Sequence, residues 1–212
     1  MIRVMLADDH QLVREGIKQL LGAASDIQVA AEAGNGDDAL AQVKAAEFDV
    51  VVLDMSMPGL SGIDLVKRVR LEKPKQKILV LSMHGEQQYA ARALKAGASG
   101  YLTKDSASSQ LVGAIRKIAA GGVHITEAVA AHLVAAPAAQ DAAPHTLLSD
   151  REFEVFRQLV DGKGITEIAD RLNLSVKTVS THKTRILQKM NLHGTADLVR
   201  YALEHGLADN KG

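Results

Sequence analysis

Short apolar runs alternate with longer segments of helical periodicity before the middle of the chain. The runs lie at 2–7, 27–31, 50–53, 78–81 and 99–102. Between them, as in 11–21 and 62–71, apolar residues recur every three or four positions, which is typical of amphipathic helices. Five strands that alternate with helices predict an α/β fold, a five-stranded, parallel, doubly wound sheet with helices on both faces.

Only helical patterns follow residue 147. Ser149 and Glu152 have the spacing of a capping box and begin a helix that reaches about residue 159. A short helix is predicted at 165–172, and Ser175 caps a longer helix that continues to about residue 190. A short helix, a tight turn and a longer helix are the plan of a helix-turn-helix, so the second unit is predicted to be small and all-α.

An alanine-rich stretch separates the two patterns. Residues 126–146 contain two of the four prolines and neither Lys nor Arg. Pro137 and Pro144 make the second half of this stretch a semi-stiff tether, whereas its first part suits a helix. We therefore predict a first domain at 1–122, a linker at 123–146 with a helix at 126–134, and a second domain at 147–212.

Composition narrows the class of protein. A chain of 212 residues suits one or two compact units and excludes a large multidomain enzyme. The absence of cysteine excludes disulfides, thiolate metal sites and a cysteine nucleophile. No segment suits a signal peptide or a membrane span, so we expect a soluble, cytoplasmic protein without a membrane partner. The 25 basic and 25 acidic residues balance, so total charge does not indicate nucleic acid, and local charge must decide.

Polar side chains stand at the ends of four predicted strands, where the binding crevice of an open parallel sheet lies. They are Asp8, Asp9, Asp54, Ser82 and Lys104. Crowded carboxylates repel one another unless a cation cancels their charge, and a hard divalent ion with oxygen ligands is the usual solution. We therefore predict Mg²⁺, held by Asp9, Asp54 and the backbone carbonyl of Ser56, together with water.

This set of residues suits phosphoryl transfer, in which catalysis is mostly positioning and neutralisation of charge. Asp54 is then the nucleophile, and the product is an acyl phosphate. Each residue has a simpler interpretation when it is considered alone. Asp54 would then be a turn or cap residue, Ser82 a turn hydroxyl and Lys104 a surface lysine. The prediction depends on the whole set, in an order that one fold brings together.

Four segments resemble the receiver domain of bacterial two-component response regulators, which has a flavodoxin-like fold. They are VMLADDH, VVVLDMSMPGLSGIDL, ILVLSMH and GASGYLTKD. The resemblance covers about residues 1–122 and implies that Asp54 accepts phosphate from the phosphohistidine of a sensor histidine kinase. It also implies that Asp9 holds Mg²⁺ directly and Asp8 through water, and that Lys104 pairs with the phosphoryl oxygens.

The same resemblance implies a switch beside the phosphorylation site. Ser82 matches the switch hydroxyl, and Tyr101 matches the aromatic side chain that turns inward when that hydroxyl moves to the phosphate. Met83 departs from the family pattern, which commonly has a small residue at this position. Met83 lies beside the route by which a phosphodonor or an attacking water reaches the pocket, and Ser56 and His84 flank that route. The resemblance therefore fixes the phosphorylation site but not the lifetime of the phosphorylated state.

The segment 175–190 concentrates positive charge. It contains no acidic residue and four basic ones, Lys177, Lys183, Arg185 and Lys189. Such a charge is typical of a helix that faces the phosphates of nucleic acid. Four basic residues alone, however, favour the simpler interpretation that one face of the helix is exposed to solvent. The preceding turn and a series of hydroxyls shift the balance toward a helix that reads base edges. The hydroxyl residues are Thr178, Ser180, Thr181 and Thr184.

Residues 148–207 resemble the LuxR-type helix-turn-helix domain of the NarL/FixJ subgroup, a four-helix domain whose closing helix matches TADLVRYALEHGL. The resemblance implies base contacts by Ser180, Thr181 and Thr184, with the four basic side chains nearer phosphates. One departure is the segment 164–166, Gly-Ile-Thr, where the family usually carries a polar Asn-Lys pair.

The closing helix of this family commonly pairs two DNA-binding domains. Leu198, Tyr201 and Ala202 are candidates for that pairing face, and ordinary packing against the bundle is the equally open alternative for the same three residues.

We interpret the chain as a phosphorylation-gated, DNA-binding response regulator rather than an enzyme of multiple turnover. Phosphorylation of Asp54 relieves inhibition and promotes binding of double-stranded promoter DNA as a homodimer. The predicted partners are a sensor histidine kinase and promoter DNA, with RNA polymerase as a further candidate.

Three alternatives belong to other classes. A magnesium-dependent phosphatase needs a second acid near the nucleophile, and the residues at 54–56, Asp-Met-Ser, lack one. A nucleotide-binding domain needs a glycine spacing that the segment 34–36, Gly-Asn-Gly, does not provide. The third alternative is a DNA-binding protein that acts without phosphorylation and keeps a vestigial pocket.

Overall fold

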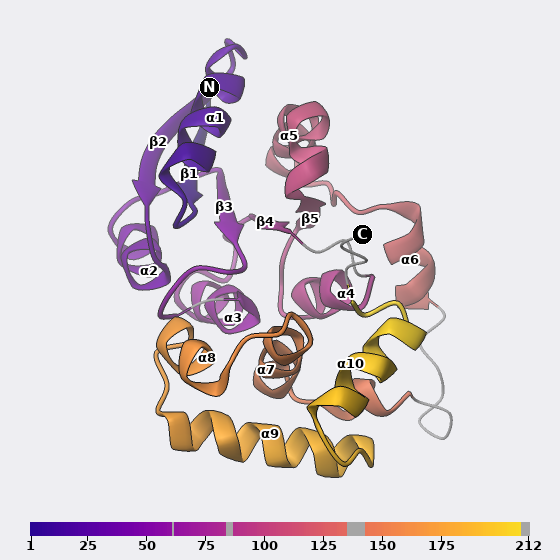
Figure 1. Cartoon of the computed structure of the whole chain (residues 1–212). Helices are drawn as coiled ribbons and strands as arrows, with labels where there is room; N and C mark the ends of the chain where they lie inside the picture. Colours follow the sequence, from indigo (N-terminus) through magenta and orange to yellow (C-terminus); the bar gives the residue numbers. More distant parts are fainter. Residues whose placement is uncertain (61, 84–86, 135–142, 209–212) are drawn as a thin grey trace. The chain divides into compact units, whose positions relative to one another are not determined.

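A computed structural model describes residues 1–60, 62–83, 87–134 and 143–208, and the chain divides into two compact units, Met1–Val134 and Ala135–Gly212 (Figure 1). Each unit has a buried apolar core of its own. His84 and residues 135–142 of the predicted linker lie outside the described residues. The domain bounds derived from the sequence stay a prediction.

The first unit is built on one parallel sheet with the strand order β2-β1-β3-β4-β5. Its strands are β1 (Ile2–Ala7), β2 (Ile27–Ala33), β3 (Val50–Asp54), β4 (Ile78–Ser82) and β5 (Gly100–Thr103). Every residue of β3 and β4 is buried, because these central strands are covered on both faces. The predicted five-stranded doubly wound fold is therefore confirmed.

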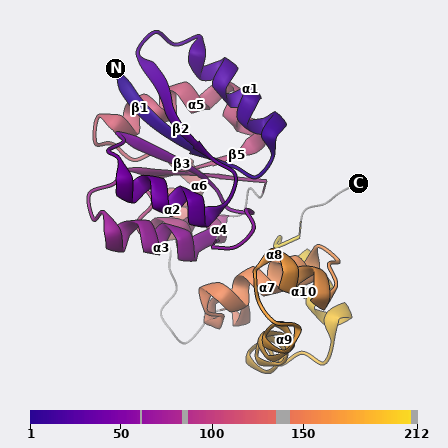
Figure 2. The ribbon, with the colours of Figure 1, turned by 90° about the vertical axis from the view of Figure 1, so that its left-hand side faces the viewer.

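Helices cover the two faces of this sheet, as Figure 2 shows. The helices of the unit are α1 (Gln11–Gly22), α2 (Gly36–Ala45), α3 (Gly62–Glu72), α4 (Gln87–Lys95), α5 (Lys104–Ala119) and α6 (Glu127–Val134). Helices α1 and α5 share one face, where their apolar residues join a core cluster with the sheet, and α2, α3 and α4 lie on the other. Helix α6 packs against α4.

The segment that follows α5 covers the edge of β5. The backbone N–H of Tyr101 donates to the carbonyl of His124 over 2.9 Å, and the N–H of His124 donates to Ser99 over 3.1 Å. An edge strand otherwise leaves a row of backbone groups without partners, so this pairing protects it. Part of the segment that the sequence assigned to the linker thus runs along the sheet.

The second unit is all-helical, as the sequence predicted. Its elements are the 3-10 helix η1 (Pro144–Leu147) and the helices α7 (Asp150–Val160), α8 (Ile165–Arg171), α9 (Val176–Met190) and α10 (Thr195–Glu204). The capping box of Ser149 and Glu152 is present at the start of α7, and Ser175 caps α9. Within the described ranges, no helix is long and apolar enough to cross a membrane.

Candidate functional site

The strand order reverses between β1 and β3, and three carboxylates lie where these two strands end. Asp8 and Asp54 are 0% and 1% exposed, whereas Asp9 is half-buried. One ligand atom each from Asp8, Asp9, His10 and Asp54 lies within 4.8 Å of the others. The crevice at such a reversal is where an open parallel sheet binds its ligand, so the fold brings the predicted acidic residues together at the expected place.

Lys104 joins this pocket from the first residue of α5. Its Nζ lies 2.6 Å from Asp8 Oδ2 and 3.1 Å from Asp54 Oδ2. Burial acts to lower the pKa of the Lys104 ammonium, but attraction to Asp54 and Asp8 outweighs it, so this pKa lies above its ordinary value. The Lys104 side chain therefore stays protonated in the pocket, and Lys104 is not the surface lysine of the alternative interpretation.

The surroundings of Asp54 disfavour the ionised form of its carboxyl group. Burial, which disfavours the charged form, raises the pKa of Asp54 to about 6, although Lys104 acts in the opposite direction. Asp54 Oδ1 is buried and accepts no hydrogen bond among the described residues. Three carboxylates around one ammonium leave an excess of negative charge, so the donor set fits a hard divalent cation such as Mg²⁺.

The predicted switch residues also lie near the pocket. Ser82 is fully buried at the end of β4, and its Cα pairs in register with that of Thr103, the residue before Lys104. Tyr101 is 5% exposed, so its ring is already inside the unit in this structure. Met83, the residue after Ser82, is 57% exposed.

The segment after β3, which carries Ser56, rests on the first turn of α2. A Cβ atom added at Gly36 would lie 1.5 Å from the carbonyl oxygen of Leu60. Gly59 has a φ of +78°, which favours glycine, and a Cβ there would lie 2.8 Å from a carboxylate oxygen of Asp37. Glycine at these positions lets the segment after β3 lie against the first turn of α2.

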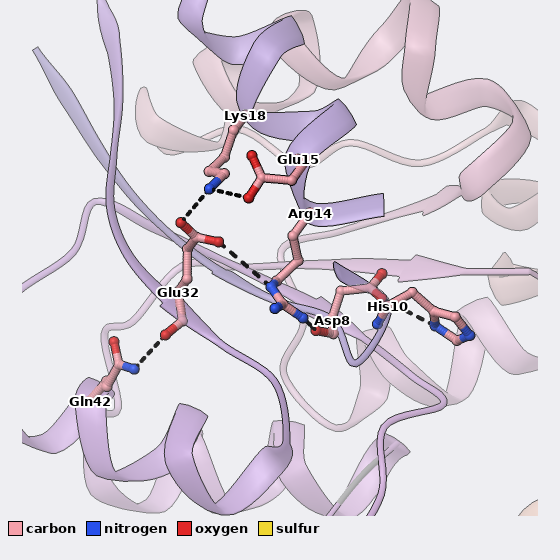
Figure 3. A network of polar contacts seen from close by, with 7 residues as sticks. All are labelled: Asp8, His10, Arg14, Glu15, Lys18, Glu32 and Gln42. Atoms are coloured by element: carbon pink, nitrogen blue, oxygen red, sulfur yellow. Dashed lines mark hydrogen bonds and ion pairs between the residues drawn. The ribbon is translucent and has the colours of Figure 1, made fainter. Parts of the chain in front are cut away.

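A polar network that sequence reasoning missed supports the acidic pair (Figure 3). Arg14 Nη1 on α1 donates to the backbone carbonyl of Asp8 over 2.5 Å, and Arg14 Nε lies 3.6 Å from Glu32 Oε2 on β2. Glu32 Oε1 also pairs with Lys18 over 2.8 Å, and the backbone carbonyl of Glu32 accepts a hydrogen bond from the Gln42 amide. These contacts join α1, α2 and β2 to the end of β1. The one signal in the sequence that could have indicated them is an arginine six residues after Asp8.

Helix α9 exposes the side chains predicted to contact DNA and buries its apolar ones. Val179, Ile186 and Met190 belong to the core of the second unit. The predicted contact residues are partly or fully exposed: Lys177, Thr178, Ser180, Thr181, Lys183, Thr184, Arg185 and Lys189. The hydroxyls of Ser180, Thr181 and Thr184 donate to backbone carbonyls one turn earlier. Their oxygen lone pairs stay available as acceptors.

Lys189 differs from the other basic residues of α9. Its Nζ lies 2.6 Å from Glu152 Oε2 on α7, a side chain that is otherwise buried. Burial acts to raise the pKa of Glu152, but Lys189 and Ser149 outweigh it and hold this pKa below its ordinary value. His182 adds no charge near neutral pH, because burial and then Arg151 lower the pKa of its imidazole.

The candidate pairing face of α10 is largely inside the unit. Leu198 and Ala202 are fully buried, which favours the bundle-packing alternative for these two residues. Tyr201 is half-buried, and its Oη lies 2.7 Å from His145 Nδ1 on η1. In the departing segment 164–166, Gly164 precedes α8 without a side-chain cap.

Comparison with known proteins assigns both units. Residues 4–116 match the response regulator receiver domain, and residues 146–202 match the luxR family of bacterial regulatory proteins. The chain is 36% identical over 211 residues to response regulator UvrY of Escherichia coli (strain K12), covering 99% of this chain and 97% of UvrY. It is 37% identical over 216 residues to oxygen regulatory protein NreC of Staphylococcus carnosus, covering 98% and 100%.

Solved structures give the same assignment. RcsB of Salmonella typhimurium superimposes with a TM-score of 0.76 at 27% identity, over 98% of each chain. A structure of RcsB from Salmonella enterica serovar Typhimurium bound to promoter rprA with the phosphomimetic BeF3- has a TM-score of 0.68 at 27% identity, over 95% of this chain and 98% of RcsB.

A receiver fold with an acidic pocket, followed by a helix-turn-helix unit, defines a DNA-binding transcription regulator and not an enzyme of multiple turnover. The chain belongs to the two-component response regulators of the NarL/FixJ type.

Proposed function

We propose that Asp54 is the phosphoacceptor and that a sensor histidine kinase supplies the phosphoryl group. In this reaction a carboxylate oxygen of Asp54 forms a bond to phosphorus while the bond between phosphorus and the donor's histidine nitrogen breaks. The observation that carries the proposal is the buried carboxylate of Asp54, 3.1 Å from the Lys104 ammonium and beside Asp8 and Asp9. Lys104 pairs with the phosphoryl oxygens and is freed from Asp54 as the acyl phosphate forms.

Mg²⁺ is the proposed cofactor of this pocket, where it would neutralise charge between the carboxylates and the phosphoryl group. Asp9, Asp54 and the backbone carbonyl of Ser56 would hold it directly, and Asp8 through water. Asp8 also orients Lys104, whose Nζ lies 2.6 Å from its Oδ2. Asp8 therefore has two tasks, to hold the cation through water and to place the ammonium, whereas Asp9 and the backbone carbonyl of Ser56 hold only the cation.

The output step is promoter binding by α9. We propose that Ser82 moves to the phosphoryl group, that Tyr101 repacks with it, and that this change relieves inhibition of the second unit and favours a homodimer. Lys177, Lys183 and Arg185 then contact DNA phosphates, while hydroxyls at 178, 180, 181 and 184 face base edges. RNA polymerase is a candidate partner at the promoter, and a cytoplasmic location is part of the same proposal.

The phosphoacceptor is tested by labelling the full chain with acetyl phosphate and Mg²⁺ and measuring its intact mass. We expect one added phosphoryl group on the wild-type chain and none on Asp54→Asn. The matched control is Asp105→Asn, which removes an exposed carboxyl outside the acidic pocket. Equal labelling of the wild-type chain and Asp54→Asn would refute the assignment.

Gating is tested by DNA footprinting with and without acetyl phosphate. The proposal requires that the phosphodonor strengthens protection by the wild-type chain and leaves protection by Asp54→Asn unchanged. Strong protection that is the same in all four samples would instead support a DNA-binding protein that acts without phosphorylation.

A further inference from the structure

His10 places an imidazole nitrogen beside the acidic pocket. Its Nδ1 lies 2.9 Å from Asp9 Oδ1 and 3.4 Å from Asp8 Oδ1. The backbone N–H of His10 donates to Asp8 Oδ1 over 2.8 Å, which fixes the residue next to that carboxylate. The side chain is 61% exposed, so the ring can adjust to a ligand without disturbing the core.

One of these separations matches an edge of a metal coordination shell. Ligand atoms about 2.1 Å from one ion are about 3.0 Å apart along an octahedral edge. The distance of 2.9 Å from His10 Nδ1 to Asp9 Oδ1 is close to this value, whereas Asp8 Oδ1 is farther away and accepts the backbone N–H of His10. Asp54 Oδ1, buried and without a hydrogen bond in the described structure, contributes a further oxygen to the same space.

A nitrogen ligand changes which cations the pocket prefers. Mg²⁺ favours oxygen ligands and keeps several waters, so it gains little from an imidazole. Imidazole suits the first-row transition ions, and their affinity for mixed nitrogen and oxygen sites increases from Mn²⁺ toward Cu²⁺ and stays high for Zn²⁺. A pocket of two carboxylates and one imidazole is therefore also a transition-metal site.

We propose that His10, Asp8 and Asp9 form a site for divalent transition-metal ions that overlaps the proposed magnesium site. His10 supplies a nitrogen ligand that Mn²⁺ can accept and that favours Zn²⁺ over Mg²⁺. Because the two kinds of ion share Asp9, they exclude each other, and the state of the phosphorylation pocket depends on which metal is supplied. This inference rests on the acidic pocket of the proposed function and adds a ligand and a class of cation to it.

Mn²⁺ provides a direct test of the ligand. The full chain is given less than one equivalent of Mn²⁺, and pulsed electron paramagnetic resonance records coupling to ¹⁴N. We expect imidazole coupling in the wild-type chain and in His193→Gln, which removes an exposed histidine of the second unit, and its loss in His10→Gln. Bound Mn²⁺ without nitrogen coupling in the wild-type chain overturns the role of His10 and leaves the magnesium proposal standing. No Mn²⁺ binding overturns both.

Zn²⁺ provides the test of selectivity. Calorimetric titrations with Zn²⁺ and with Mg²⁺ are compared for the wild-type chain, His10→Gln and His10→Asn, after circular dichroism has shown each variant folded. We expect both variants to lower Zn²⁺ affinity about tenfold or more and to change Mg²⁺ affinity much less, because only the transition ion gains from nitrogen. Equal losses for the two ions would show that His10 merely supports the loop, which overturns the proposal.

Discussion

Lys189 on α9 holds its ammonium 2.6 Å from Glu152 Oε2 on α7, and the same oxygen accepts the backbone N–H of Ser149 over 2.8 Å. The ion pair therefore ties the third helix of the unit to the capping box that begins its first helix. Glu152 is 4% exposed, so without Lys189 its carboxylate would stay buried and lack its cation.

Lys189→Ala is expected to cost stability more than DNA affinity. We expect a loss of about 1 to 2 kcal/mol in the free energy of unfolding, a reduced value because the lysine itself is partly exposed. The measurement is hydrogen exchange of α7 and α9 peptides, together with the salt dependence of DNA binding. The double variant with Glu152→Gln should recover part of the lost stability. A fall in the salt slope without any loss of protection would instead place Lys189 at a DNA phosphate.

Lys183→Ala and Arg185→Ala are expected to behave in the opposite way. Neither side chain forms an ion pair among those found in the described residues, and Lys183 is partly exposed and Arg185 exposed on α9, as the proposed phosphate contacts require. Each change should weaken binding to all sequences and reduce the slope of log affinity against log salt by roughly 1. Titrations at several salt concentrations on a specific and a random duplex measure this. An unchanged slope in both variants would argue against α9 as the phosphate-facing helix.

Features set by neighbouring residues could be predicted from the sequence, whereas contacts between distant residues could not. The buried strands could be predicted because unbroken apolar runs at 50–53 and 78–81 are local patterns, and Asp54 follows the first of them directly. The four basic residues of α9 could be counted but not ranked, because only helix packing places Lys189 against a residue 37 positions earlier. For the same reason the support of Asp8 by Arg14, and of Arg14 by Glu32, depended on the register of α1 and β2.

Arg14→Ala is expected to weaken the phosphorylation pocket without touching a metal or phosphate. The guanidinium holds the backbone carbonyl of Asp8, so its removal should let the acidic pair move and lower Mg²⁺ affinity about tenfold. Calorimetry measures that affinity, and Arg14→Lys should recover only part of it, because an ammonium cannot reach the carbonyl and Glu32 in the same fork geometry.

Arg70→Ala is the matched control for this prediction. Arg70 also donates to backbone carbonyls, those of Gly97 and Pro74, but it lies on α3, and none of its contacts found in the described part of the chain reaches the acidic pair. Its removal should reduce stability and leave Mg²⁺ affinity nearly unchanged. Equal losses of Mg²⁺ affinity in the two arginine variants would show a general effect of stability on the pocket and would refute the positioning role of Arg14.

Metal removal should reveal the cost of ionised Asp54. Its pKa is about 6 in the folded chain against an ordinary value of 3.8, so the folded state binds the proton more tightly than the unfolded state does. The stability of the metal-free chain should therefore fall as pH rises from about 4 to about 6 and stay reduced above that range. Asp54→Asn removes the buried charge and should be more stable at pH 7.5 by up to about 3 kcal/mol, with roughly half of that advantage left at pH 5.

Hydrogen exchange of β3 and β4 peptides in chelator, at pH 7.5 and pH 5, measures this difference within the first unit. The control variant Asp161→Asn changes an exposed carboxyl of the second unit and should leave those peptides unaffected. Addition of Mg²⁺ should protect the wild-type peptides more than those of Asp54→Asn, because the cation removes the repulsion among Asp54, Asp8 and Asp9. If Asp54→Asn is the less stable chain in chelator at pH 7.5, then the ion pair with Lys104 outweighs burial and the direction of the Asp54 pKa shift is wrong.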